Sequence, residues 1–264
     1  LVETILENRG IKNSKEHLSP SLDTIPSYKK LHGATKAAKK ILKYAKEGKK
    51  IVIHGDFDCD GISASALLWE FLFRDVSKVL GKKVDVVPYI PSRIDQGYGL
   101  TESSIQDVKD LGCDLLITVD CGVRDKELIN KYSKGLDFVI TDHHQPPEDI
   151  SEDLNYILVH QMYPDKEYPN KEVCGTAVAY LLAQALRDEL KMEENKEYGL
   201  DLVALSTVTD MMSLLDVNRI FVKFGLEQIS KRKRLGLNAL ILRSGILPED
   251  INSYHLGYVI GPRI

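Results

Sequence analysis

A short stretch near residue 50 carries four side chains that can bind metal ions. His54, Asp56, Asp58 and Asp60 directly follow the apolar residues 51–53. Carboxylates at alternate positions repel one another where they converge, so this cluster is stable only if it faces water or a neutralising cation. The pattern predicts a strand that delivers ligands into a turn and, with them, a pair of bound metal ions.

Three later segments end in the same kinds of side chain: Asp120 follows residues 115–119, Asp142-His143-His144 follow residues 138–141, and Asp210 interrupts the apolar, small-residue sequence 205–212, which we expect to be helical. A single aspartate after a strand is more often a helix N-cap than a ligand. Independent N-caps would not also supply imidazoles, so the joint occurrence indicates one site. Mixed carboxylate and imidazole ligands suit Mn²⁺, with Mg²⁺ as the alternative where oxygens dominate.

Short apolar segments alternate with helical patterns along most of the chain. We expect strands at 51–54, 84–89, 115–119, 138–141 and 156–159, and helices at 2–8, 32–47, 62–79, 101–111, 124–134, 174–190, 199–215, 218–231 and 234–243. Such alternation predicts an α/β fold with a mostly parallel sheet flanked by helices, followed by a helical segment and a linker helix. In an open parallel sheet, ligands gather beyond the carboxyl ends of the strands, where the predicted ligands lie.

Composition limits the classes of function. The 35 basic and 39 acidic residues give a net charge of −4, which argues against a chain that coats nucleic acid by bulk charge. A local basic groove is still allowed, formed by Lys82, Lys83, Arg93 and Arg124. The basic run 231–234 is expected to be a solvated helix end, with a nucleic-acid contact as the alternative.

Apolar segments and cysteines bear on the compartment. No apolar run reaches the length of a membrane span, and the first residues lack the layout of a signal peptide. We therefore expect a cytoplasmic protein with no membrane contact. Its four cysteines, which show no C-x-x-C spacing, are expected to be free and reduced.

The ordered motifs of this chain resemble those of the DHH phosphoesterase superfamily, and within it the RecJ family of single-strand-specific 5′-to-3′ DNA exonucleases. The motifs are His54-Gly55-Asp56-Phe57-Asp58-Cys59-Asp60-Gly61, Val119-Asp120-Cys121-Gly122, Asp142-His143-His144, Cys174-Gly175-Thr176-Ala177, and Asp201-Leu202-Val203-Ala204-Leu205 with Asp210. Residues 90–93, 97–100 and 260–264 resemble the RecJ family in particular. The resemblance covers about residues 10–264.

The resemblance implies a role for each motif residue. It makes His54, Asp58 and Asp120 the ligands of one metal ion, and Asp60, Asp120, His143 and Asp210 the ligands of the other. The bridging Asp120 and the pair Asp142 and His144 would be catalytic, with His144 contacting the scissile phosphate and Asp142 orienting the imidazoles. Asp56 would support the ligands from behind. Arg93, Tyr98 and Arg263 would bind substrate.

The implied activity is two-metal hydrolysis of phosphodiester bonds. Two ions about 3.5–4 Å apart lower the pKa of a water molecule and neutralise the phosphoryl oxygens. The resemblance implies single-stranded DNA as substrate, 5′-mononucleotides as products, two Mn²⁺ ions or Mg²⁺ as cofactors, and a role in DNA repair and recombination. A single-strand-binding protein or a helicase would be the protein partner.

Two features depart from the RecJ pattern. Residues 159–162 read Val-His-Gln-Met where an asparagine-proline pair is expected. The chain also stops at residue 264, where the pattern would continue into a DHH-associated domain and an OB-fold. We accordingly expect a helical lead-in at 1–50, a DHH phosphoesterase domain at 51–230, and a linker helix with the start of a truncated DHH-associated domain at 231–264.

Three other functions are compatible with parts of the sequence. Asp58 and Asp60 also fit the nucleophile motif of haloacid-dehalogenase-type phosphatases, although His54 and Asp56 already occupy the strand end. A second possibility keeps the superfamily but changes the substrate to short oligonucleotides, cyclic dinucleotides or pyrophosphate. A third is a catalytically silent replication scaffold of the same fold, against which the complete set of six candidate metal ligands argues.

Overall fold

The computed structural model of the chain describes residues 1–148, 150, 154–164 and 166–264. Its centre is a five-stranded, fully parallel sheet in the order β2-β1-β3-β4-β5. The strands are β1 (Ile51–Gly55), β2 (Val86–Tyr89), β3 (Leu115–Val119), β4 (Asp137–Thr141) and β5 (Ile157–Val159). β1 and β3 are buried along their whole length, which explains why they read as continuous apolar runs rather than as alternating ones. The predicted α/β fold with a mostly parallel sheet is confirmed.

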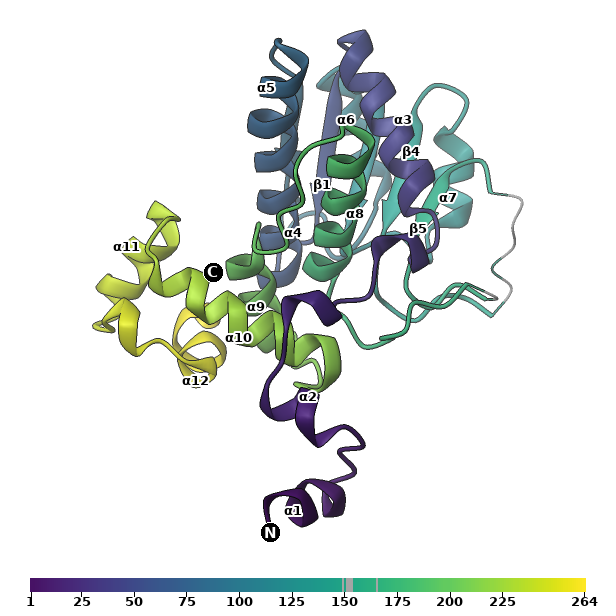
Figure 1. Cartoon of the computed structure of the whole chain (residues 1–264). Helices are drawn as coiled ribbons and strands as arrows, with labels where there is room; N and C mark the ends of the chain where they lie inside the picture. Colours follow the sequence, from purple (N-terminus) through teal and green to yellow (C-terminus); the bar gives the residue numbers. More distant parts are fainter. Residues whose placement is uncertain (149, 151–153, 165) are drawn as a thin grey trace.

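Helices cover both faces of this sheet (Figure 1). Inward residues of β1 and β3, such as Ile53 and Ile117, share one core with α3 (Ala34–Glu47), α4 (Cys59–Glu70) and α8 (Gly175–Glu189). The alternate residues, such as Val52 and Leu116, share a second core with α6 (Glu102–Asp110) and α7 (Lys126–Tyr132). This division follows from the period of two along a strand, which sends neighbouring side chains to opposite faces.

A second group of helices follows the sheet and forms the lower left part of Figure 1. It contains α9 (Leu200–Thr209), α10 (Asp216–Ser230), α11 (Leu235–Arg243) and α12 (Ser253–His255), which continues into a π-helical segment, η5 (Leu256–Ile260), and a short 3₁₀ turn, η6 (Gly261–Arg263). Leu205, Leu237 and Leu256 lie in the third apolar core, which holds this group together. At the other end of the chain, α1 (Val2–Asn8) and α2 (Ser14–Leu18) precede the 3₁₀ turns η1 (Leu22–Thr24) and η2 (Tyr28–Lys30).

Two element boundaries differ from the prediction in places that matter for the site. The helix expected at 62–79 begins at Cys59, because the Asp58 side chain accepts hydrogen bonds from the backbone N–H groups of Asp60 and Gly61. It continues through a π-helical segment, η3 (Phe71–Val76), into α5 (Ser77–Leu80). The helix expected at 199–215 ends at Thr209, so Asp210 is its C-cap residue and not a residue within the helix.

Most side chains of the basic run at 231–234 form ion pairs with other parts of the chain. Arg234 donates to Asp201 at 2.6 Å and to Glu70 at 2.8 Å, which ties the start of α11 to α9 and α4. Arg232 pairs with Glu249, and Lys231 with Glu197. These ion pairs account for most of the run as structural contacts between helices.

Two expectations drawn from composition can be compared with the structure. All four cysteines are free, as predicted. Within the described ranges, none of the helices combines the length and the apolar character that crossing a bilayer requires.

Candidate metal centre

The predicted ligands meet at the carboxyl edge of the sheet. β1 leads into His54 to Asp60, β3 into Asp120, and β4 into Asp142 to His144. In the strand order 2-1-3-4-5 the connections leave in opposite directions from β1 and β3, which opens a crevice at this switch point. Asp210 reaches the same place from the end of α9, since His143 Nε2 lies 3.5 Å from its Oδ2 atom.

Asp60 is held by the amino end of α8. Its carboxylate accepts hydrogen bonds from Gly175 N at 2.6 Å, from Thr176 N at 2.8 Å and from Thr176 Oγ1 at 2.6 Å. Free N–H groups and the helix dipole make the start of a helix a good site for a negative charge. Thr176 lies within a motif that the sequence singled out, but its role as a partner of Asp60 becomes visible only in the structure.

Asp120 adopts an unusual backbone conformation at the end of β3. Its φ of 63° lies in the left-handed region, which aspartate tolerates better than most residues do. Gly175 passes so close that a Cβ atom there would lie 2.8 Å from Asp120 Cβ and Oδ1. Only a glycine at position 175 therefore allows α8 to begin beside Asp120. The Oδ1 atom of Asp120 is buried without a hydrogen-bond partner.

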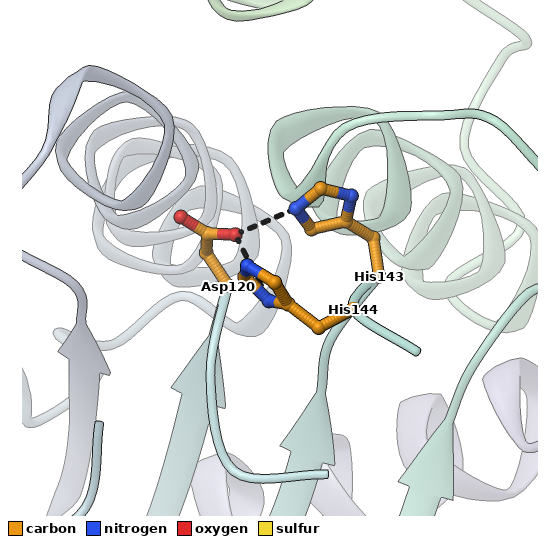
Figure 2. Close-up of side chains that lie close together, drawn as sticks. All are labelled: Asp120, His143 and His144. Carbon is orange, nitrogen blue, oxygen red and sulfur yellow. Dashed lines mark ion pairs between the residues drawn. The ribbon is translucent and has the colours of Figure 1, made fainter. Parts of the chain in front are cut away.

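His143 is the point on which three carboxylates converge. Its Nε2 atom lies 3.1 Å from Asp120 Oδ1, 3.5 Å from Asp210 Oδ2 and 3.8 Å from Asp60 Oδ2. Figure 2 shows one carboxylate oxygen of Asp120 facing the imidazoles of both His143 and His144. The structure thus brings together all four residues that were expected to bind the second metal ion.

Asp142 organises the turn that carries both histidines. Its Oδ1 atom accepts from the backbone N–H groups of His143 and His144 at 2.7 and 3.1 Å, and pairs with His144 Nδ1 at 2.8 Å. Its Oδ2 atom accepts from Val123 N at 2.9 Å. Burial raises the pKa of Asp142, but the hydrogen bond and charge of His144 and the backbone donors outweigh it, so the net pKa is lowered. The same hydrogen bond raises the pKa of His144.

The residues expected around the first metal ion are arranged less completely. Ligand atoms of Asp56, Asp58 and Asp120 lie within 4.8 Å of one another. Asp58 is exposed and also caps α4, whereas Asp56 is buried and its Oδ1 atom has no partner. His54 is fully buried, with its Nδ1 atom 3.7 Å from Cys121 Sγ and its Nε2 atom without a partner. The geometry therefore places Asp56 among the candidate ligands, while the sequence assigned it a supporting role.

The charges at this edge fit divalent cations. Burial, together with the neighbouring carboxylates Asp60 and Asp58, raises the pKa of Asp120 well above its ordinary value and that of Asp210 to about 7. Burial also raises the pKa of Asp56 to about 6 and lowers that of His54 to about 4. Metal ligands must be deprotonated carboxylates and neutral imidazoles. A cation supplies the positive charge that this group of carboxylates lacks, so the residues present fit metal binding.

The residues expected to bind substrate lie at different distances from this centre. The hydroxyl of Tyr98 lies 3.1 Å from both ring nitrogens of His144, with the two rings edge to face. Arg93 is exposed and lies over the ring of Phe57, next to the ligand turn. Arg263 donates to Val259 O, in a turn that packs against the end of α9. No contact between Arg263 and the candidate ligands is found among the described residues.

Two lysines proposed for the basic groove lie elsewhere. Lys82 and Lys83 precede β2, so they lie toward the amino edge of the sheet, opposite the candidate ligands. Lys82 donates to Lys46 O, and Lys83 lies over Phe73. Arg124 follows β3 at the carboxyl edge, where its Nε atom donates to Gln145 O. The expectation that all four basic residues line one groove is therefore wrong for the two lysines.

Comparison with known proteins gives a consistent family assignment. Residues 50–207 match the model of the DHH family, N-terminal domain. The chain is 37% identical over 235 residues to the single-stranded-DNA-specific exonuclease RecJ of Bacillus subtilis, which covers 89% of this chain and 28% of that protein.

Solved structures agree. RecJ of Thermus thermophilus in complex with Mn²⁺ superposes with a TM-score of 0.75 at 32% identity, covering 98% of this chain and 35% of that one. The same protein in complex with Mg²⁺ gives a TM-score of 0.67 at 30% identity, covering 98% of this chain and 32% of that one. The chain thus spans about a third of the length of each of these relatives.

Proposed function

Because the chain belongs to the DHH family, we propose that it is the catalytic part of a metal-dependent phosphodiesterase that degrades single-stranded DNA from the 5′ end, releasing 5′-mononucleotides. The observation that carries this proposal is the convergence of Asp60, Asp120 and Asp210 on His143, with the Asp142–His144 pair beside them. A relative with 37% identity is a single-stranded-DNA-specific exonuclease, and solved structures of RecJ with 30–32% identity are complexes with Mn²⁺ or Mg²⁺.

The chain's own residues divide the work of holding metal ions and substrate. Asp60, Asp120, His143 and Asp210 would hold one ion, and Asp58 and Asp120 with His54 or Asp56 would hold the other. Bound ions would supply the positive charge and the activated water that phosphodiester hydrolysis requires. His144, whose Nδ1 atom pairs with Asp142 and whose Nε2 atom lies 3.1 Å from the Tyr98 hydroxyl, would contact a non-bridging oxygen of the scissile phosphate and stabilise the charge that develops there.

We assign substrate recognition to residues around the metal centre at the carboxyl edge of the sheet. Arg93 offers an exposed guanidinium to the phosphate backbone, and we assign a second phosphate contact to the exposed Arg263 of η6. Tyr98 is 55% exposed and offers a ring face on which a base can stack. The proposal also places the DHH domain at 51–230 and a linker after it. It assigns the protein to DNA repair and recombination in the cytoplasm, with a single-strand-binding protein or a helicase as partner.

The decisive experiment compares substrates and variants side by side. A long 5′-phosphorylated single strand and a dinucleotide are each incubated with Mn²⁺, and the release of mononucleotides is followed from the 5′ and the 3′ label. We expect release from the 5′ label of the long strand. We expect Asp120→Ala to lower the rate by at least about a thousandfold, because several kcal/mol of transition-state stabilisation are lost.

A matched variant controls for the loss of a carboxylate elsewhere. Asp137→Ala removes an aspartate from the opposite end of β4, where it pairs with Lys40, and should leave the rate unchanged. Hydrolysis of the dinucleotide alone would favour a phosphodiesterase for short oligonucleotides or cyclic dinucleotides. Absence of both Mn²⁺ binding and hydrolysis would reject the enzymatic proposal in favour of a silent scaffold.

A further inference from the structure

Two buried polar residues directly after β5 have no role in the proposed chemistry. His160 and Gln161 stand where the RecJ pattern has a different pair, and both are fully buried. Burying polar side chains costs free energy unless each finds a hydrogen-bond partner. Their partners therefore indicate what the pair does.

Both side chains donate to the main chain of residues 142–144, the turn that follows β4 and is called the histidine turn below. Gln161 Nε2 donates to His143 O at 2.6 Å. Met162 N donates to His160 Nδ1 at 3.0 Å, so the proton of the neutral imidazole resides on Nε2, which lies 2.9 Å from His144 O and donates to it. The two consecutive carbonyls of the turn are thus each fixed by one side chain.

The pair is itself held firmly. His160 N donates to His32 O, and Gln161 O accepts from Tyr168 N at 2.9 Å. β5 pairs with β4 up to the register Thr141 with Val159, so the two segments leave the sheet side by side. The hydrogen bonds to His32, before the sheet, and to Tyr168, in the following loop, hold His160 and Gln161 in place beside the histidine turn.

Satisfying the buried groups does not by itself explain the choice of residues. Gln161 Oε1 remains buried without a hydrogen-bond partner, so only one end of this amide is satisfied, by its bond to His143 O. What Gln161 adds is a donor aimed at the carbonyl of the residue whose imidazole faces Asp60, Asp120 and Asp210. Groups that orient a metal ligand from behind typically change metal affinity or activity by about 10–100-fold.

We propose that His160 and Gln161 are positioning residues that fix the main chain of His143 and His144 and thereby the direction of both imidazoles toward the metal centre. This inference rests on the proposed function, because it assumes that His143 binds a metal ion. It assigns part of the site's rigidity to a segment outside the metal-ligand motifs.

The test compares Mn²⁺ affinity with folding stability. Gln161→Met keeps the volume and removes the donor, and we expect Mn²⁺ affinity measured by calorimetry to fall at least about tenfold. Tyr168→Phe is the matched control: it removes one partly buried hydrogen bond, from Tyr168 Oη to Pro26 O, in the same loop but away from the histidine turn. We expect this control to lose similar stability in urea unfolding and to keep wild-type Mn²⁺ affinity.

A second pair of variants tests the other donor and replaces the first if Gln161→Met does not fold. His160→Asn keeps a side-chain N–H donor and should bind Mn²⁺ within a few-fold of wild type, whereas His160→Phe should lose about tenfold. In hydrolysis, the loss should fall on kcat and leave KM for the strand nearly unchanged.

The outcomes separate this inference from the function on which it rests. If the wild type binds Mn²⁺ and the donor-less variants bind it equally well, the pair only completes the packing and the inference fails alone. If the wild type itself binds no Mn²⁺, the proposed function fails and the inference falls with it.

Discussion

At the scale of single residues, the aspartates of the site differ in how firmly hydrogen bonds hold their carboxylates. Asp60 is saturated with hydrogen bonds from the start of α8, so its orientation is set before any ion arrives. Asp120 and Asp210 each have an oxygen atom that faces His143 Nε2 but accepts no hydrogen bond, and the side chain of Asp210 is 26% exposed. We therefore expect Asp60 to be the rigid carboxylate of the proposed centre, and Asp120 and Asp210 to be the two that can still adjust to an ion.

His32 allows a pH prediction away from the metal centre. Its ring stacks on Tyr163 at 3.6 Å, and burial, followed by the charges of Lys166 and Lys36, lowers its pKa from 6.5 to about 4. The unfolded chain therefore takes up a proton at His32 below pH 6.5, which the folded chain resists until about pH 4. Stability contributed by neutral His32 is complete above pH 6.5 and is lost as the pH falls through this window.

Urea unfolding at pH 7 and pH 5 measures this effect. His32→Phe keeps a ring for Tyr163 but cannot titrate, so its loss of stability between the two pH values should be smaller than that of the wild type. The expected difference is on the order of 1 kcal/mol, because solvent screens a half-buried ring. Equal losses in the two proteins would show that the His32 proton does not contribute.

At the scale of elements, the site depends on where helices begin and end. α4 begins on the capping side chain of Asp58, and α8 begins beside Asp60 and Asp120. α9 ends at the residue before Asp210, so the position of this proposed ligand depends on how α9 packs against α10. This packing requires a glycine, since a Cβ atom on Gly225 would lie 2.2 Å from Leu200 O and 2.3 Å from Ala204 Cβ.

Two glycine substitutions test this dependence. Gly225→Ala gains up to about 1 kcal/mol of helix propensity but overpacks the contact between α9 and α10, which costs roughly 1–3 kcal/mol. We expect a net loss of stability and weaker Mn²⁺ binding as Asp210 moves. Gly236→Ala, in α11, meets no atom within 4 Å and should be neutral or stabilising. Thermal unfolding measures the Tm of both variants. An equal change in Tm would contradict the close packing of Gly225 as the cause.

At the scale of the whole molecule, several carboxylates lie close together at the carboxyl edge of the sheet. Packing of the apolar cores must offset the repulsion between them. Burial and mutual repulsion raise the pKa of both Asp120 and Asp210, so the metal-free fold carries a destabilising site. An ion that binds the folded chain and not the unfolded one removes this penalty and adds its own binding free energy. Metal occupancy should therefore be measurable as folding stability.

Thermal unfolding with and without Mn²⁺ measures this coupling. At a concentration 100 times Kd, one site adds about 2.7 kcal/mol, which for a chain of this size raises Tm by roughly 5–10 °C. Asp120→Ala should lose the increase while its metal-free Tm stays equal to or above that of the wild type, because one repelling charge is gone. A wild-type Tm that does not respond to Mn²⁺ would contradict occupation of the site.

The sequence alone was sufficient for the fold class and for the group of Asp60, Asp120, His143 and Asp210 that the structure brings together. Apolar strands that end in aspartate or histidine specify a parallel sheet with a loaded carboxyl edge, since strand period and chain direction are local properties. Only the tertiary structure decided how those groups are supported. The capture of Asp60 by Thr176, the approach of Gly175 to Asp120, and the hydrogen bonds from His160 and Gln161 to the histidine turn join residues far apart in the chain. Such contacts depend on the packing of whole elements, which no local pattern of residues encodes.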